Sequence, residues 1–246
     1  MIPETVSLAA VAVLAFTSTV RSTLGFGDSL LAMPLLLLFI PLTTATPLVA
    51  LVAVSISVLL LLKTWRNVRF NEIAVLVAAS VAGIPIGIYG LAAVPEHIAI
   101  FILGFSISTY ALFKMLRPDL LKLESNRLAP LFGLLSGVFG GAFNNNGPPI
   151  VVYSTLRGWE SEAFVANLQG FFLTSGIFIV AGHGLAGLWT APVTHTWIAS
   201  LPVCALAVVT GRYLSKFIKP NAFDKTVYAV LGLAGLTLIT KSLGFI

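Results

Sequence analysis

The sequence GVFGGAFNNNGPPIVVY, residues 137–153, places three asparagines and two prolines inside an apolar window. The window covers residues 128–156, has no formally charged side chain, and is bounded by Arg127 and Arg157. By its hydropathy it belongs in a lipid bilayer, which a helix crosses with about 20 apolar residues. Proline, glycine and asparagine all disfavour the interior of a helix. The stretch therefore predicts a helix that is broken inside the membrane.

The composition of the whole chain also indicates a membrane protein. Of its 246 residues, 58% are hydrophobic and 9% are charged, and the mean hydropathy is +1.01. An average soluble domain has about a quarter charged residues. The net charge of +5 comes from basic residues in a few short loops, which is typical of membrane orientation and gives no reason to expect a nucleic-acid partner. We therefore predict an all-α polytopic membrane protein.

Six further stretches approach the length that a membrane-spanning helix needs. They are residues 45–62, 73–93, 98–113, 163–182, 197–213 and 226–240. Three lie in each half of the chain, and each half begins instead with an irregular stretch, at 5–40 and at 128–156. Each half is thus predicted to contain one broken-helix hairpin followed by three transmembrane helices.

The two halves resemble each other along the chain. Setting Gly25 on Gly140 also sets Pro34 on Pro149, and further matches follow with offsets that grow only at loops. Chance matches in a glycine-rich apolar chain are the alternative, but an internal repeat explains the constant order. We predict a first repeat at 1–117, a cytoplasmic linker at 118–128 and a second repeat at 129–246, which together form one transmembrane domain.

Loop charges orient these repeats. The loops at 40–47, 90–97 and 183–196 contain no lysine or arginine and are expected outside, while the basic loops are expected in the cytoplasm. Both conditions hold if each hairpin returns to the side of the membrane on which it began and three crossings follow. Because three is an odd number, the second repeat then starts on the opposite side and is inverted relative to the first. The prediction is an inner-membrane protein with both termini outside, into which Lys241 fits poorly. Whether the hairpins cross fully or are re-entrant stays open.

The first break, RSTLGFGDSLLAMP at 21–34, contains two charges, Arg21 and Asp28. A charge near the bilayer centre costs roughly 3 kcal/mol on insertion scales, so a function is expected. Arg21 would attract an anion, and Asp28 would balance it or take up a proton. Alternatively, the two residues pair with each other, or Arg21 snorkels to the interface. Ser22, Thr23 and Ser29 are further candidates beside Arg21.

Glycines and asparagines complete the candidate binding site. Glycine allows tight turns whose exposed N–H groups can bind an anion, although small residues also let membrane helices pack closely. The glycines concerned are Gly25, Gly27, Gly140, Gly141 and Gly147, the last followed by Pro148. Amide side chains can bind an oxyanion and release it, or can cap the broken helix ends. The amides concerned are Asn144, Asn145 and Asn146, with Asn167 and Gln169 as second-rank candidates that interhelical bonding would also explain.

The sequence contains no enzyme or cofactor motif that we recognise. It has no phosphate-binding loop, no dinucleotide fingerprint and no nucleophile elbow. His183 and His195 lack neighbours at metal-ligand spacing. We expect neither catalysis, nor a bound cofactor, nor a metal site.

The paired motifs LGFGDSLLAMPLL and LSGVFGGAFNNNGPPIVVY resemble those of the TauE/SafE sulfite exporter family. The resemblance extends over nearly the whole chain in two copies. It implies a bacterial inner-membrane permease for small sulfur-containing or organic anions such as sulfite or sulfonates, without an ATP-binding subunit. It maps the family's glycine-rich elements onto Gly25, Gly27, Gly140, Gly141 and the Gly147–Pro148 pair. Asp28 and the asparagine triplet depart from the family pattern, so the resemblance does not fix the substrate.

We therefore expect a secondary transporter that moves a small anion by alternating access around a site built from both breaks. A cation-coupled carrier or an ion channel that uses Asp28 and the oxygens of Asn144–Asn146 is the alternative, and a non-transporting scaffold is a third. The expected partners are the anion and the lipid bilayer. H⁺ or Na⁺ as a coupling ion, a homo-oligomer, and the direction of transport stay open.

Overall fold

The computed structural model describes residues 4–116, 123, 125–159, 161–217 and 220–245. These residues form α-helices and two short 3-10 helices, with no strand among them, which confirms the all-helical class. Six helices are long and apolar enough to cross a membrane by length and composition. The chain is thus a multi-pass membrane protein.

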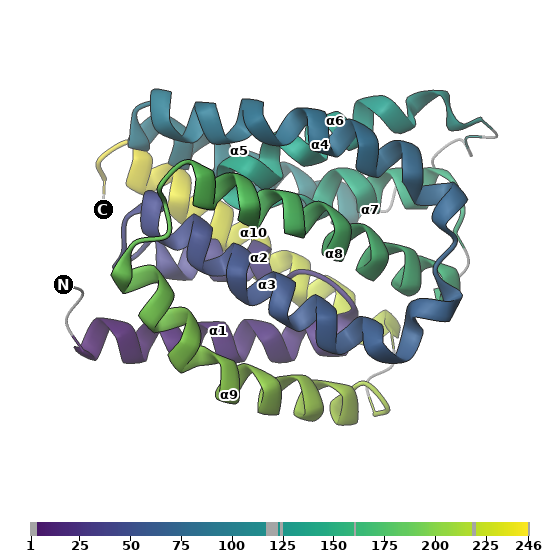
Figure 1. Cartoon of the computed structure of the whole chain (residues 1–246), viewed down its shortest axis with the longest axis horizontal. Helices are drawn as coiled ribbons and strands as arrows, with labels where there is room; N and C mark the ends of the chain where they lie inside the picture. The colour runs from purple at the N-terminus through teal and green to yellow at the C-terminus, as the bar shows by residue number, and fades with distance from the viewer. Residues whose placement is uncertain (1–3, 117–122, 124, 160, 218–219, 246) are drawn as a thin grey trace.

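The first half of the chain contains five of the α-helices (Figure 1). They are α1 (Glu4–Leu24), α2 (Asp28–Leu36), α3 (Leu42–Thr64), α4 (Phe70–Ala93) and α5 (Glu96–Leu116). The second half contains α6 (Ala129–Phe143), α7 (Gly147–Leu156), α8 (Ser161–Leu185), α9 (Ala191–Leu214) and α10 (Pro220–Ser242). The three long helices predicted in each half are present, each extended by a few residues beyond its apolar stretch.

The helices run back and forth between two ends of the bundle. Helix α1 begins and α10 ends on one side, and α5 ends and α6 begins on the other (Figure 1). We call these the terminal end and the linker end. Of the lysine and arginine residues that the structure describes, all except Arg21 and Lys241 lie toward the linker end. This separation is the one on which the predicted orientation rests.

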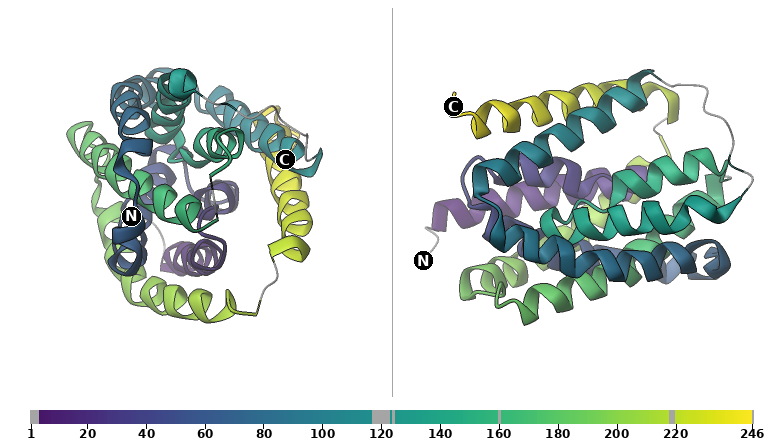
Figure 2. Two further views of the ribbon diagram at one scale, coloured as in Figure 1. Left: turned by 90° about the vertical axis from the view of Figure 1, so that its right-hand side faces the viewer. Right: turned by 90° about the horizontal axis from the view of Figure 1, so that it is seen from above.

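Helices of the two halves pack against each other in matching pairs. Helix α1 lies along α9 and α6 along α4, α3 lies along α9 and α8 along α4, and α5 pairs with α10 as α3 does with α8. Exchanging α1 for α6, α3 for α8, α4 for α9 and α5 for α10 reproduces these pairs, whereas the contact of α2 with α10 has no equally extensive counterpart between α7 and α5. Figure 2 shows the α5–α10 pair at the flank of the bundle, with α1 and α2 further inside.

The first irregular stretch is more regular than its sequence suggests. Helix α1 is continuous over 21 residues and long enough to cross a membrane, whereas residues 5–40 were expected to lack a clean helix. Its hydroxyl side chains bond to carbonyls of their own helix, as Ser18 does to Leu14 and Ser22 to Ser18. Such bonds satisfy a polar side chain without ending the helix. The break is confined to residues 25–27.

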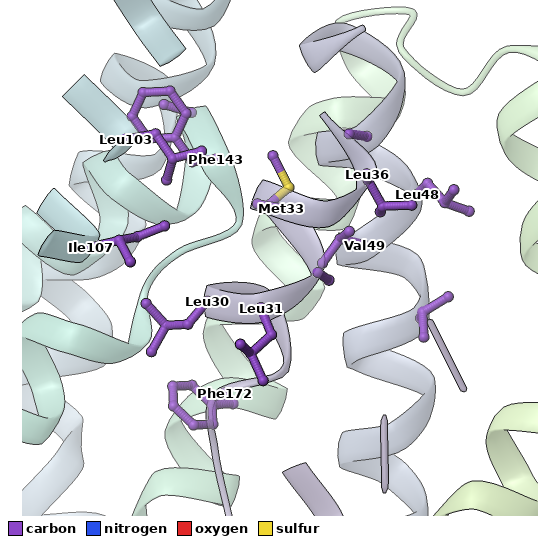
Figure 3. Packing of buried hydrophobic residues seen from close by; sticks show 14 of the residues in the cluster. Leu30, Leu31, Met33, Leu36, Leu48, Val49, Leu103, Ile107, Phe143 and Phe172 are labelled. Atoms are coloured by element: carbon purple, nitrogen blue, oxygen red, sulfur yellow. The ribbon is translucent and has the colours of Figure 1, made fainter. Parts of the chain in front are cut away.

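Helix α2 lies in the core of the protein. Eight of its nine residues are buried, Pro34 among them. Figure 3 shows Leu30, Met33 and Leu36 between α3 and the side chains of α5 and α6. A helix of nine residues is too short to cross a bilayer, so its stability comes from this surrounding protein. The position fixes the start of α2, and with it the first break, deep inside the bundle.

Candidate functional site

The two breaks meet at one small cavity inside the bundle. The first break contributes Arg21, Gly27, Asp28 and Ser29, and the second contributes Asn144, Asn145, Asn146 and Gly147. Helix α3 adds Ser57 and helix α8 adds Phe172. The amide of Asn144 donates to the hydroxyl of Ser29 at 3.3 Å and so joins the breaks directly. The cavity measures about 20 Å³, which is room for about one water molecule.

The chain reverses at the two breaks by different means. Gly25 and Gly27 have φ angles of 88° and 99°, in the left-handed region that glycine adopts without strain. At the second break the left-handed residue is Asn144, with φ 50°, and asparagine is among the side chains that tolerate this conformation. The predicted turn at Gly25 and Gly27 is confirmed.

The turn that the sequence predicted at Gly140 and Gly141 is wrong. Both residues lie within α6, where the absence of a side chain serves packing. A Cβ atom on Gly141 would lie 2.4 Å from the carbonyl oxygen of Ile84 on α4, and one on Gly140 would lie 2.8 Å from a methyl group of Ile179. Helix α6 therefore approaches α4 as closely as backbone allows, which is the small-residue packing of membrane helices.

Arg21 is held by a set of interior partners. Its side chain is 2% exposed and pairs with Asp28 at 2.8 Å. The guanidinium also donates to the hydroxyl of Ser57 at 2.6 Å, to the side-chain oxygen of Gln169 at 3.1 Å and to the carbonyl of Ala53 at 3.2 Å. The structure has the Arg21–Asp28 pair that the sequence left as one alternative, and the side chain does not snorkel to an interface. Such a pair is neutral as a whole, which is the condition for burying a charge.

The guanidinium also lies over an aromatic ring. The central carbon of the Arg21 guanidinium is 5.3 Å from the centre of the Phe172 ring, a favourable cation–π distance. The Nε atom of Arg21 has no hydrogen-bond partner among the described residues. One donor of the buried cation is therefore unused.

The three asparagines have different surroundings. Asn144 donates to Ser29, and Asn146 donates to the hydroxyl of Ser175 at 3.1 Å. Asn145 is 2% exposed, and neither its side-chain nitrogen nor its oxygen has a partner among the described residues. An unpaired buried amide costs free energy and calls for an explanation. Two of the three amides thus hold the break together, and one is unengaged at the cavity.

Several predicted site residues lie away from the cavity. The hydroxyl of Thr23 donates to carbonyls of Thr19 and Gly211, and Ser22 bonds only within α1. Gly25 directly precedes the lining residue Phe26, and its carbonyl accepts from the side-chain nitrogen of Gln169 at 2.5 Å. Further candidates outside the cavity lining are Gly140, Gly141 and Pro148.

The two second-rank candidates have different positions. The side chain of Asn167 accepts from the backbone N–H of Arg69 and donates to Glu72, both at 2.8 Å, so it joins α8 to the start of α4. Gln169, two residues later, contacts both Arg21 and the turn of the first break. Interhelical bonding, the alternative that the sequence left open, accounts for Asn167.

Two cavity residues have no distinguishing signal in the sequence. Ser57 is one of several hydroxyl residues in an apolar span, and only its bond to Arg21 sets it apart. Phe172 is one of 17 phenylalanines, and no spacing marks it. Among the described residues, no three histidine, cysteine, aspartate or glutamate side chains form a group that could hold a metal ion.

Comparison with known proteins agrees with this arrangement. A family model described as Sulfite exporter TauE/SafE matches residues 9–238, which include both breaks and every helix around the cavity. No curated protein and no solved structure matches the chain. The chain therefore belongs to the sulfite exporter TauE/SafE family and is a membrane transporter.

Proposed function

We propose that the protein is a secondary transporter that moves a small oxyanion across the inner membrane by alternating access around the central cavity. The substrate is sulfite, a sulfonate or another small organosulfur or organic anion. The observation that supports the proposal most is a buried guanidinium and an unpartnered buried amide at the same cavity, one from each break. A cavity of about 20 Å³ is too small for such an anion, so binding requires the cavity to widen.

Hydrogen bonding explains how the cavity would bind an anion. An oxyanion can accept the donors of Arg21 that now go to Ser57 and Gln169, and the amide of Asn145 can donate to a second oxygen. Helices α2 and α7 both begin at the cavity, so the partial positive charges of two helix N-termini are added. Uncharged donors favour release as well as binding, as transport requires.

Charge balance indicates a role for Asp28. The Arg21–Asp28 pair is neutral, so a monoanion would leave one uncompensated negative charge in a low-dielectric interior, which is costly. A proton taken up by Asp28 would restore neutrality. We infer that anion and proton move together, as an anion–H⁺ symport.

A cation carrier or channel is the second candidate. The unpartnered side-chain oxygen of Asn145 would suit a cation, and Asp28 would supply the charge. The pairing of Asp28 with Arg21 at 2.8 Å opposes it, because the cation would lie beside a guanidinium.

The helix pairing and the loop charges support the proposed topology. Two repeats related by a twofold axis in the membrane plane would give the exchanged contacts of α1 with α9 and of α6 with α4. With the basic residues facing the cytoplasm, the linker end is inside and the terminal end outside. Reporter fusions after Arg127 and after Ser242 test this orientation, since they should report opposite sides of the membrane.

Flux in proteoliposomes tests the function. Vesicles containing the purified protein are loaded with radiolabelled sulfite, methanesulfonate, taurine or acetate and compared with protein-free vesicles. The proposal expects saturable flux of at least one anion, accelerated by a pH gradient and insensitive to a Na⁺ gradient. Na⁺-dependent flux without pH dependence would favour the cation-coupled carrier, and non-saturable conductance would favour a channel. Failure of every anion to move would contradict the proposal.

A further inference from the structure

A second, larger cavity opens at the linker end of the bundle. It measures about 340 Å³ and is lined by residues from α1, α2, α5, α7, α8 and α10, from the turn between α1 and α2, and by Ser215 directly after α9. Its polar lining consists of Thr23, Lys114, Ser215 and Tyr228, and the exposed Ser215 places its mouth at the surface. We call it the linker-end chamber. Its size suits a small organic anion, and its mouth includes a positive charge.

One side chain lines both the chamber and the central cavity. Phe26 and Gly27 are the residues that line both spaces, and Gly27 has no side chain. The Phe26 ring packs edge-on against Phe164 of α8, with ring centres 6.5 Å apart and an interplanar angle of 83°. The side chain shared by the two spaces is therefore an apolar aromatic ring.

The turn around Phe26 has open space beside Gly27. The residues on either side are Gly25 and Gly27, both in the left-handed conformation. A Cβ atom on Gly27 would have no neighbour within 4 Å, so the turn is loosely packed on this side. Small residues next to a dividing side chain allow it to swing without displacing the helices that flank it.

A single amide connects this turn to the buried cation. The side-chain nitrogen of Gln169 donates to the carbonyl of Gly25 at 2.5 Å, and its oxygen accepts from Arg21 at 3.1 Å. Both contacts come from the planar side-chain amide of Gln169, so a change in its contact with Arg21 also changes its contact with Gly25. Gln169 thus joins the cavity to the backbone next to Phe26.

We propose that Phe26 is the gate between the linker-end chamber and the central cavity, and that Gln169 keeps it closed while Arg21 is unoccupied. This inference rests on the proposed function. An oxyanion at Arg21 takes over the donor that Gln169 now accepts. The amide then loses one of its two anchors, its hold on Gly25 weakens, and Phe26 swings toward the chamber. Binding in the cavity is in this way coupled to opening on the linker side.

Thiol accessibility in detergent tests the gate independently of membrane orientation. The one native cysteine is removed by Cys204→Ala, and single cysteines are introduced as Val54→Cys in the central cavity or Leu24→Cys in the chamber. A water-soluble methanethiosulfonate reagent should label Leu24→Cys readily and Val54→Cys slowly. Phe26→Ala should accelerate labelling of Val54→Cys by at least about tenfold, because a barrier that opens only transiently is removed.

A second variant and a control make this result specific. Phe26→Leu should give an intermediate labelling rate, and neither Phe26 variant should change the rate at Leu24→Cys. An unchanged rate at Val54→Cys in both Phe26 variants, with Leu24→Cys still labelled, would overturn the gate.

The proposed role of Gln169 in keeping the gate closed is tested with methanesulfonate, which does not react with the thiol reagent. Gln169→Leu should accelerate labelling of Val54→Cys in the absence of anion, and methanesulfonate should then have no further effect. In the protein with Gln169, methanesulfonate should itself accelerate labelling. The control is Thr174→Val on the same helix, whose hydroxyl bonds only to the carbonyl of Gly170. Equal labelling rates of Val54→Cys in Gln169→Leu and Thr174→Val, or no response to methanesulfonate with Gln169 present, would overturn the proposed role of Gln169.

The gate and the proposed function fail separately in these experiments. Labelling of the Phe26 variants requires no transported substrate. An opened cavity without anion flux would therefore overturn the transport proposal alone. Saturable anion flux together with unchanged labelling of the Phe26 variants would overturn the gate alone.

Discussion

The two hairpins, α1–α2 and α6–α7, occupy matching places in the fold and have opposite chemistry. The first contains the charges, and its Arg21 has four hydrogen-bond acceptors around it. The second is uncharged, and its Asn145 has no partner among the described residues. The charged group, Arg21, thus already has protein partners without a ligand, whereas the uncharged amide of Asn145 is available as a donor. A ligand would displace bonds at the first break and form new ones at the second.

The hairpins also differ in how firmly the backbone is held. The first break turns at Gly25 and Gly27, and a Cβ atom on Gly27 would have no neighbour within 4 Å. The second follows α6, which is locked against α4 by glycine contacts such as Gly137 with Ser80 and Gly141 with Ile84. The comparison indicates that close packing anchors the second hairpin, which we call the fixed wall, while the proposed gate requires movement only at the first break.

The largest expected effect comes from removing the charge of the first break. Arg21→Gln should reduce anion flux to that of empty vesicles, and it should destabilise the protein by about 3–5 kcal/mol because Asp28 is left buried and unpaired. The double variant Arg21→Gln with Asp28→Asn should recover stability but not flux, measured by thermal unfolding in detergent and by vesicle flux. Substantial flux in the double variant would remove the first break from the site.

The second break should respond to substitution in the opposite sense. Asn145→Leu removes an amide with no protein partner, so thermal stability should stay the same or increase while flux falls by about tenfold, the value of one hydrogen bond to a charged group. Asn146→Leu is the matched comparison, because it removes the amide that donates to the hydroxyl of Ser175 and should lower the melting temperature. A loss of stability in Asn145→Leu alone would indicate a structural role for this amide.

The fixed wall can be probed through its glycines. Gly141→Ala should cost about 1–3 kcal/mol through overpacking, since the new Cβ atom would meet the Ile84 carbonyl at 2.4 Å. Gly147→Ala should be tolerated, because the nearest atom would be on Phe172 at 3.7 Å. Thermal unfolding of both variants checks the contrast, and equal stability would mean that α6 and α4 separate at no cost.

The smallest expected effect concerns the bond between the hairpins. Ser29→Ala removes the hydroxyl that accepts from Asn144 and should cost about 0.5–1.5 kcal/mol. Ser22→Ala, whose hydroxyl bonds only within α1, should change stability by less than about 0.5 kcal/mol. If the two variants unfold at the same temperature, the hairpins are not held together by this contact.

Hydropathy and residue type were enough to predict much of this fold. The span predicted at 73–93 corresponds to α4 at Phe70–Ala93, because lipid-facing helices need continuous apolar residues. The two breaks were also predicted, since proline, glycine and buried charge are visible in one sequence. The assignment of Arg21, Asp28 and the asparagines as site residues stays a prediction of function, although the structure brings them together.

Other features depend on neighbours that a sequence does not reveal. Helix α1 stays continuous although it is rich in serine and threonine, because their hydroxyl groups bond to carbonyls of the same helix. From composition alone, these residues suggested an irregular stretch. Gly141 serves packing because α4 happens to lie against it. The same holds for the asparagine triplet, in which identical side chains have different partners only because the surrounding helices differ.

The interior position of α2 has a consequence for how the chain is assembled. Helix α2 contacts α10, which is synthesised long after it, and the ammonium group of Lys241 at the end of α10 donates to the carbonyl of Leu37 at the end of α2. A nine-residue helix has no stable transmembrane position of its own. Helix α2 therefore reaches its final place only after α10 has entered the membrane, and a ribosome that stops before α10 leaves the first hairpin unfinished.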